Sequence, residues 1–303
     1  MATIFTSAIA DGVKLTLDEV VNDDMGLSQS TALYSKYMSI SNMADNYVDD
    51  LSMGGIGLAA ETGEGTELPS TTLKEDYLTR YFSRKFGLKL AITEEAIEDN
   101  KYEQILMLGK RLPRALYKTI DMDCTNIFIR ATNANYIGGD GQPLASAAHT
   151  LANGGTFSNT LATPLSPSRI AMTVVATALH KLPGHDGTVE GYEPKKIVCP
   201  EEQRYVWRGI LGSEKAPEPG QFNQINVVKT DMDIDLVPIK YWTTTTTNWG
   251  VISDADNGLK FKWRRKPRTR DWVDNAQEIM NYAISCRYSR GWSDPRCFLF
   301  SNA

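Results

Sequence analysis

The chain has 303 residues, of which 42% are hydrophobic and 23% are charged, and its formal net charge is −5. This length and apolar content suffice for one large domain or two modest ones with buried cores, and they exclude an intrinsically disordered protein. The negative charge argues against a protein whose main work is to neutralise nucleic-acid phosphates, because such proteins normally carry a basic excess.

The cysteines and the N-terminus indicate the compartment in which the protein resides. Cys124, Cys199, Cys286 and Cys297 are scattered, without a C-x-x-C pair and without a histidine nearby at metal-ligand spacing. We expect them to be reduced and mostly buried. The first residues lack a basic segment followed by a long apolar run, and no stretch of 18 apolar residues occurs. We therefore expect a cytosol-like compartment and no membrane partner.

The first 45 residues are weakly periodic, with apolar residues scattered among small polar ones. Such a segment can form short helices but cannot bury much surface against itself. We expect an extended arm that a partner stabilises.

Residues 53–93 have the features of a long β-hairpin. Five glycines between Gly54 and Gly65, followed by Pro69, disfavour helix. From Tyr77 to Leu90, apolar and basic residues alternate with a period of two, which indicates strand. Because isolated hairpins are rarely stable, we expect the polar tip to lie on a neighbouring molecule.

A long amphipathic helix of roughly 28 residues is predicted next, with Thr93 as its cap. Its apolar stripe steps by four through Leu108, Leu112, Leu116, Ile120, Cys124 and Phe128. Pro113 should kink this helix, because proline lacks an N–H and clashes with the preceding turn. A continuous apolar stripe predicts a core face and not a cofactor site.

The remaining chain mixes helix and strand, which makes the class α+β. We expect helices over residues 167–182, 201–211 and 277–285. We expect strands over residues 195–200, 225–230, 234–247, 248–254, 259–263 and 296–301.

Residues 138–150, GGDGQPLASAAHT, form a glycine-rich stretch that ends near His149. It lacks the lysine of a phosphate-binding loop and fails the spacing of a dinucleotide fingerprint. His149 has no G-x-S-x-G elbow nearby, and the sequence names no carboxylate to orient it. We predict that Gly138, Gly139 and Gly141 act as a hinge, and that His149 is a packing or hydrogen-bonding residue.

The segment LHKLPGHDG places His180 five residues before His185, with Asp186 adjacent. Pro183 and Gly184 break the helix between the two histidines, so their side chains do not share a helical face. We predict an exposed loop here. No catalytic, cofactor-binding or metal site is predicted in the chain.

Residues 260–270 carry seven cations in eleven residues, with Trp263 among them. These cations are Lys260, Lys262, Arg264, Arg265, Lys266, Arg268 and Arg270. Residues 37–73 contain no lysine or arginine but six acids, of which Glu61, Glu64 and Glu67 lie at the hairpin tip. We favour docking of the acidic tip on the basic strand of another copy. A nucleic-acid patch and a solvated strand remain alternatives.

The order of arm, hairpin, long helix and α/β segment resembles that of the major capsid proteins of tailed bacteriophages. The motifs that carry the resemblance are ITEEAIEDN, GGDGQPLASAAHT, KKIVCPEEQRYVWRGIL and YAISCRYSRGWSDPRCFLF. The sequence is most similar to the subset that includes the Mu-like major head subunit. The resemblance implies the Hong Kong 97-type capsid fold, with an N-terminal arm, an E-loop hairpin, a spine helix, a P-domain and an A-domain.

By this resemblance the arm spans residues 1–44 and the E-loop residues 45–89. The P-domain comprises residues 90–137 and 252–288, and the A-domain residues 138–251 and 289–303. The implied function is a non-enzymatic capsid subunit that self-assembles as hexamers and pentamers into an icosahedral shell around double-stranded DNA, without sequence specificity. The implied location is the virion, and the host cytoplasm during assembly. The implied partners include a portal and decoration proteins.

Two departures from the family pattern affect these expectations. The chain begins almost at its arm, which implies a separate scaffold protein in place of a removable N-terminal segment. Residues 37–73 contain no lysine, so we predict no isopeptide cross-link from the E-loop. The alternatives are an encapsulin-type nanocompartment shell and, more distantly, a soluble α/β hydrolase or transferase that uses His149 or His180.

Overall fold

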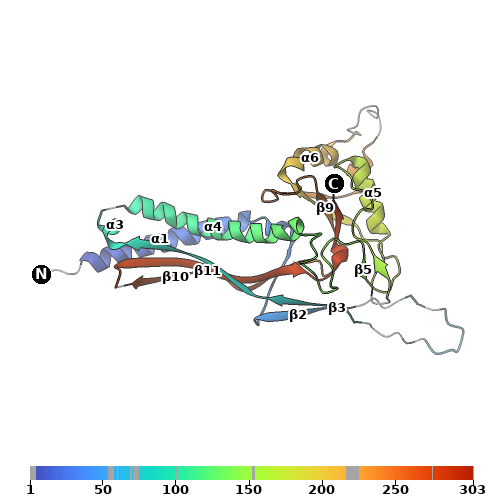
Figure 1. Ribbon diagram of the computed structural model, residues 1–303, viewed down its shortest axis with the longest axis horizontal. Helices are drawn as coiled ribbons and strands as arrows, with labels where there is room; N and C mark the ends of the chain where they lie inside the picture. The colour runs from blue at the N-terminus through green and yellow to red at the C-terminus, as the bar shows by residue number, and fades with distance from the viewer. Residues whose placement is uncertain are drawn as a thin grey trace.

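Two lobes of unequal length make up the computed structural model of the protein (Figure 1). The structure describes residues 5–53, 58–59, 61–68, 70, 75–99, 101–151, 154–215, 225–274 and 276–302. The long lobe is a layer of helices on a sheet, and the short lobe sits at one end of it. A two-stranded ribbon emerges where the lobes meet.

The sheet of the long lobe has the strand order β1-β10-β11-β4. Its strands are β1 (Ser39–Asn42), β10 (Leu259–Asp274), β11 (Ile279–Trp292) and β4 (Arg84–Thr93). β1 is parallel to β10, and the other neighbours are antiparallel. On β11 the even-numbered residues from Met280 to Tyr288 are buried and face the helices. The helices thus cover one face of the sheet. The charged residues of β10 lie mostly at exposed or half-buried positions.

The long helix predicted from the apolar stripe is α4 (Tyr102–Ile129), which has 28 residues. It runs along one face of the sheet (Figure 1). The stripe is buried from Leu112 onward, whereas Leu108 is 43% exposed. The helix begins later than predicted, because the residues after Thr93 form a separate short helix, α3 (Glu94–Glu98).

The expectation of an extended arm without its own core is wrong. Residues Phe5–Thr31 form one helix, α1, which packs along α4. Leu17 and Val21 are fully buried in the same core as the α4 stripe. Gly109 of α4 provides the space for Leu17, since a Cβ at Gly109 would overlap the Leu17 side chain. The stabilising partner of this segment therefore lies in the same chain.

The short lobe is built on the sheet β12-β9-β7-β8. The strands are β12 (Phe298–Ser301), β9 (Trp249–Ser253), β7 (Pro194–Pro200) and β8 (Asp235–Ile239). The helices around it are α5 (Arg169–His180), η1 (Glu201–Gln203), α6 (Arg204–Gly212) and α7 (Val227–Asp231). Trp207 and Trp249 meet edge to face, with ring centroids 4.6 Å apart, in the core of this lobe.

Three predictions of local structure are corrected. The helix predicted over residues 277–285 is wrong, and residues 279–285 belong to β11, because pairing with β10 and β4 on both sides favours strand over local helical periodicity. The strand predicted over residues 225–230 forms most of α7. The strand predicted over residues 234–247 ends at Ile239.

The ribbon consists of β2 (Tyr47–Met53) and β3 (Glu75–Phe82), paired antiparallel. The strand predicted from alternation is confirmed, with Tyr77 and Tyr81 on the buried face. Residues 84–90, expected in the same hairpin, belong to β4 in the sheet instead. Much of the predicted glycine-rich tip lies outside the described residues; residues 58–59, 61–68 and 70 are described and exposed.

Smaller elements connect these parts. They are α2 (Tyr34–Tyr37), β5 (His149–Thr150), β6 (Thr156–Phe157) and η2 (Pro295–Cys297). The four cysteines are free and buried, as predicted. Within the described ranges, none of the helices has the length and apolar character needed to cross a membrane.

Candidate functional site at the base of the ribbon

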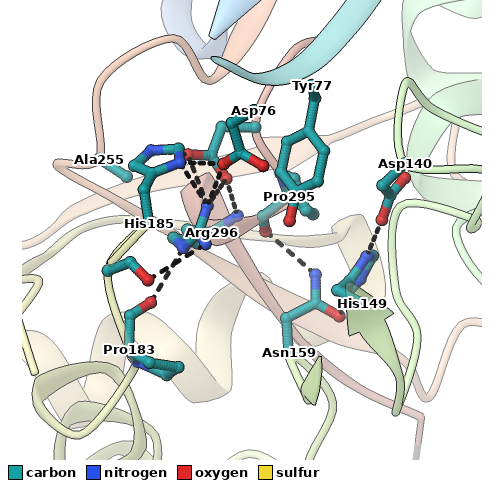
Figure 2. Close-up of polar contacts among 12 residues, drawn as sticks. Asp76, Tyr77, Asp140, His149, Asn159, Pro183, His185, Ala255, Pro295 and Arg296 are labelled. Atoms are coloured by element: carbon teal, nitrogen blue, oxygen red, sulfur yellow. Dashed lines mark hydrogen bonds and ion pairs between the residues drawn. The ribbon is translucent and has the colours of Figure 1, made fainter. Parts of the chain in front are cut away.

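Four segments distant in sequence converge where the ribbon joins the two lobes. They are the start of β3, the glycine-rich loop before His149, the loop after α5, and η2 between β11 and β12. Figure 2 shows the polar side chains that connect them. This convergence brings together several charged side chains that are buried or nearly so.

Arg296 of η2 lies at the centre of this site and is fully buried. Its Nη1 is 3.2 Å from a carboxylate oxygen of Asp294 and 3.8 Å from one of Asp76. Its Nε donates to the carbonyl of Pro183 at 2.9 Å, which ties η2 to the loop after α5. The guanidinium also lies over the ring of Phe157, 4.7 Å from its centroid. A buried charge needs such compensation, because desolvation is costly.

His185 lies beside Arg296, between two carboxylates. Its Nδ1 hydrogen-bonds to Asp76 of β3, and its Nε2 lies 3.2 Å from Asp294. These hydrogen bonds, the one to Asp294 first and then the one to Asp76, raise the pKa of His185 to about 9 against the opposing effect of burial. Burial alone would raise the pKa of Asp294, but the hydrogen bond from His185 and the charge of Arg296 lower it overall.

His149 is fully buried and hydrogen-bonded through both ring nitrogens. Its Nδ1 is 2.5 Å from Asp140, and its Nε2 is 3.0 Å from Oδ1 of Asn159. The amide of Asn159 donates to the carbonyls of Leu144 and Pro295, so Oδ1 faces His149 as an acceptor. The hydrogen-bonded role predicted for His149 is confirmed. Its carboxylate partner, Asp140, lies in the glycine-rich stretch itself.

The three glycines of this stretch allow close packing and a turn. A Cβ on Gly138 would lie 2.6 Å from Nε1 of Trp292, and one on Gly139 would lie 2.9 Å from the carbonyl oxygen of Leu78 in β3. Gly141 has a φ of +75°, which favours glycine. The predicted hinge therefore packs closely against the base of the ribbon. That the chain moves at this hinge stays a prediction.

The prediction of an exposed loop around the other two histidines is wrong for His185, whose side chain is 14% exposed. His180 is 47% exposed and lies 3.4 Å from Glu193, away from this site. Among the residues that the structure describes, no group of three or more histidine, cysteine or acidic side chains could hold a metal ion.

The basic strand, residues 260–270, is part of β10. Lys260 and Lys262 point to Asp50 of the ribbon in the same chain, with the Nζ of Lys262 3.6 Å away. Arg265 donates to Ser285 at 2.8 Å. Burial lowers the pKa of Arg265, and the positive charges of neighbouring arginines lower it further. These neighbours are Arg268, Arg270 and Arg287.

A groove of about 390 Å³ lies on this cationic surface. Its basic lining residues are Lys85, Lys89, Arg265 and Arg270. The two lysines belong to β4 and were not predicted, although their alternation with apolar residues on β4 could have indicated them. The three glutamates of the ribbon tip, Glu61, Glu64 and Glu67, are exposed. Within the described part of the chain, none of the three forms an ion pair.

The family model described as "Phage capsid protein" matches residues 76–299, which is more than half of the chain. The chain belongs to the phage capsid protein family. No curated protein matches its sequence. The sequence match spans β3, η2 and the basic strand, so the whole site lies within the family region.

Solved structures with the same fold include phage capsid proteins. A chain of Microbacterium phage Oxtober96 has a TM-score of 0.56 at 10% identity, with 89% of this chain and 90% of that chain covered. The capsid of Cyanophage P-SCSP1u gives 0.56 at 11% identity, with 89% and 87% covered. The virus-like particle from Pyrococcus furiosus gives 0.54 at 8% identity, with 93% and 96% covered. These identities establish the shared fold alone.

The protein is thus a phage major capsid protein with the Hong Kong 97-type fold predicted from its motifs. The division of the chain into an arm, an E-loop, a P-domain and an A-domain is a prediction from the resemblance. The residue boundaries of these domains stay predictions. The charged residues Asp76, Asp294 and Arg296 were not predicted as a site. The local signal in the sequence is limited to an acid and a base, Asp294 and Arg296, that flank Pro295.

Proposed function

We propose that this major capsid protein forms hexamers and pentamers in an icosahedral shell that encloses double-stranded DNA without reading its sequence. The observation that carries the proposal is the family match over residues 76–299, joined to a fold shared with phage capsids. The role is structural and not enzymatic. His149, the best candidate for a base, is fully buried with both ring nitrogens engaged, which supports that role.

The contact between copies that the charges favour joins the acidic ribbon tip of one subunit to the basic strand of another. Arg265 stands among like charges and the tip glutamates are exposed, so docking would relieve repulsion on the basic side. Lys260 and Lys262 are engaged by Asp50 within the chain. The docking surface accordingly comprises Arg264, Arg265, Lys266, Arg268 and Arg270, extended by Lys85 and Lys89 of β4.

Other partners follow from the family. A separate scaffold protein would guide assembly, a portal would occupy one vertex, and decoration proteins would add stability where no isopeptide cross-link forms. The E-loop has no lysine before Lys74, which supports the absence of that cross-link. Assembly would take place in the host cytoplasm, and the finished protein would reside in the virion.

Negative-stain microscopy of the purified full-length chain, with and without a co-expressed scaffold, tests the proposal. We expect closed particles, and nuclease-resistant DNA inside particles isolated from infected cells. Particles that contain protein cargo and no DNA would favour an encapsulin-type compartment, an alternative that the fold shared with the Pyrococcus furiosus particle leaves in place. A chain that stays monomeric at every concentration would overturn the shell function.

A further inference from the structure

The base of the ribbon is attached to the short lobe through four charged side chains. They come from β3, from the loop after α5 and from η2, and we call them the junction cluster: Asp76, His185, Asp294 and Arg296. The side chains of Asp76 and Asp294 are each 2% exposed, and that of Arg296 is fully buried. Water therefore screens these charges very little, and their mutual balance controls the energy of the contact.

The junction cluster balances only when His185 is protonated. Asp76 and Asp294 contribute two negative charges, and Arg296 contributes one positive charge. Both ring nitrogens of His185 face carboxylate oxygens, and Nδ1 also lies 3.3 Å from Nη1 of Arg296. A neutral imidazole carries only one N–H, so it can donate to only one of the two carboxylates. Loss of the proton would leave one carboxylate facing a ring lone pair and one buried negative charge without a counter-ion.

Charged and titratable groups surround His185. They come from every element packed against the ring and include acids, tyrosines and Arg296: Asp76 and Tyr77 from β3, Asp186, Glu190 and Tyr192 from its own segment, Asp256 from the β9–β10 connection, and Asp294 and Arg296 from the η2 turn. The hydrogen bonds to Asp294 and Asp76 favour the protonated ring, whereas burial and the positive charge of Arg296 oppose protonation. A cavity of about 460 Å³ next to the ring gives solvent a route to its proton.

The same η2 turn also holds the ribbon at a second point. The hydroxyls of Tyr81 and Ser293 are 2.7 Å apart, and Ser293 donates to Asp50 of β2 at 2.6 Å. The outward face of the ribbon is exposed at Tyr47, Leu78 and Phe82. The ribbon is thus held at its base by the junction cluster and, separately, by the contacts of Tyr81 and Asp50.

We propose that the junction cluster holds the base of the ribbon on the short lobe while His185 is protonated, and that it releases the ribbon when His185 is neutral. While the junction cluster holds the ribbon, the ribbon and the short lobe move as one unit. The short lobe then sets the direction in which the ribbon tip points. The proposal concerns the attachment within one chain, and it stands whether or not the acidic tip docks on a neighbouring basic strand.

The direction of the pH dependence follows from His185. Its pKa rises from 6.5 to about 9 in the folded chain, so the stabilisation is complete below pH 6.5 and is lost as the pH rises through about 9. The pKa of Asp294 is lowered, so its contribution persists until the pH falls below the ordinary carboxyl range. The ribbon is therefore held on the short lobe at neutral pH and released in alkali.

Hydrogen–deuterium exchange of the full-length chain at pH 7 and pH 10, corrected for intrinsic exchange rates, tests the proposal. The two pKa values predict that protection of β3 amides falls by up to about 70-fold between these conditions, while α4 amides keep theirs. Light scattering at both pH values keeps the assembly state matched. Equal protection of β3 at pH 7 and pH 10 would overturn the proposal.

Variants identify the responsible group. His185→Gln should show low β3 protection already at pH 7 and no further pH-linked fall, whereas His180→Gln should behave as the wild type because His180 is exposed and remote. Burial lowers the pKa of Lys262, which also lies beside Asp50, so a fall that persists in His185→Gln would assign the effect to Lys262 and overturn the proposal. Asp76→Asn, which removes the charge from the ribbon side, should reproduce the His185→Gln result; wild-type protection in Asp76→Asn would count against it.

Discussion

Arg114 of α4 holds Asp24 of α1 through two hydrogen bonds, with Nε donating at 2.8 Å and Nη2 at 2.5 Å to the two carboxylate oxygens. The pair fixes the register of α1 on α4 at a point where Asp24 is buried. The first helix is therefore part of the folded long lobe of this subunit.

The contact between α1 and α4 should contribute substantially to subunit stability. Leu17→Ala should lower the free energy of unfolding by about 3 kcal/mol, because it removes a fully buried side chain and leaves a cavity against Gly109. Leu15→Ala is the matched control, since Leu15 is 71% exposed and should change stability by less than about 0.5 kcal/mol. Urea unfolding of both variants measures the difference, and equal effects would show that α1 is not part of the core.

Two glycine substitutions should change stability in opposite directions. Gly139→Ala should destabilise the chain by about 1–3 kcal/mol, because the new Cβ would press on Thr79 and on the backbone of Leu78 in β3. Gly209→Ala should stabilise it by about 0.5–1 kcal/mol. Nothing lies within 4 Å of the new Cβ, and alanine has a higher helix propensity than glycine in the interior of α6. Thermal unfolding of both variants and the wild type measures these changes in stability. A neutral Gly139→Ala would show that the loop yields without cost.

Local periodicity was enough to predict the elements that bury one face. The four-residue spacing from Leu112 to Phe128 gives α4, and alternation around Tyr77 and Tyr81 gives β3. The burial of Leu17 could not be read locally, because it depends on a groove at Gly109, far along the chain. The strand β11 was misassigned for the same reason, since its two neighbours decide its conformation.

The candidate site was harder to predict than the fold. The glycine-rich stretch and its histidine were recognised, but Asp140 could not be assigned to His149 before the loop geometry was known. Asp76 and Asp294 are more than 200 residues apart and meet only at His185. A long-range contact of this kind leaves no periodic signal in the sequence, because it is produced by the crossing of separate elements.

The native cysteines should be unreactive at mildly alkaline pH. Burial raises the pKa of both Cys199 and Cys286 to about 12, so at pH 8 these thiols are protonated as well as inaccessible. A chromogenic disulfide reagent should therefore label the four thiols only after denaturation. Glu64→Cys is the positive control, because an exposed thiol at the tip should react in the native state. Rapid labelling of the native wild type would contradict this prediction.

Charge reversal tests the docking of the acidic tip on the basic strand. Arg268→Glu with Arg270→Glu should raise the concentration needed for assembly by about tenfold or more, since like charges would then face each other across the interface. These two exposed residues are preferable to Arg265, which donates to Ser285 in its own chain. Adding Glu64→Lys and Glu67→Lys to the same chain should restore much of the assembly, measured by light scattering and microscopy.

The control for this rescue is Lys110→Glu, which reverses an exposed charge on α4 and should leave assembly unchanged. High salt should weaken wild-type assembly and reduce the difference between the variants, because salt screens exposed charges. A quadruple variant that assembles no better than Arg268→Glu with Arg270→Glu would rule out direct pairing of the tip with the basic strand. The cationic groove between β10 and β4 would then have to serve a different anionic partner. Double-stranded DNA, which the proposed shell would enclose, would be the first to test, with subunits titrated against a duplex at low salt.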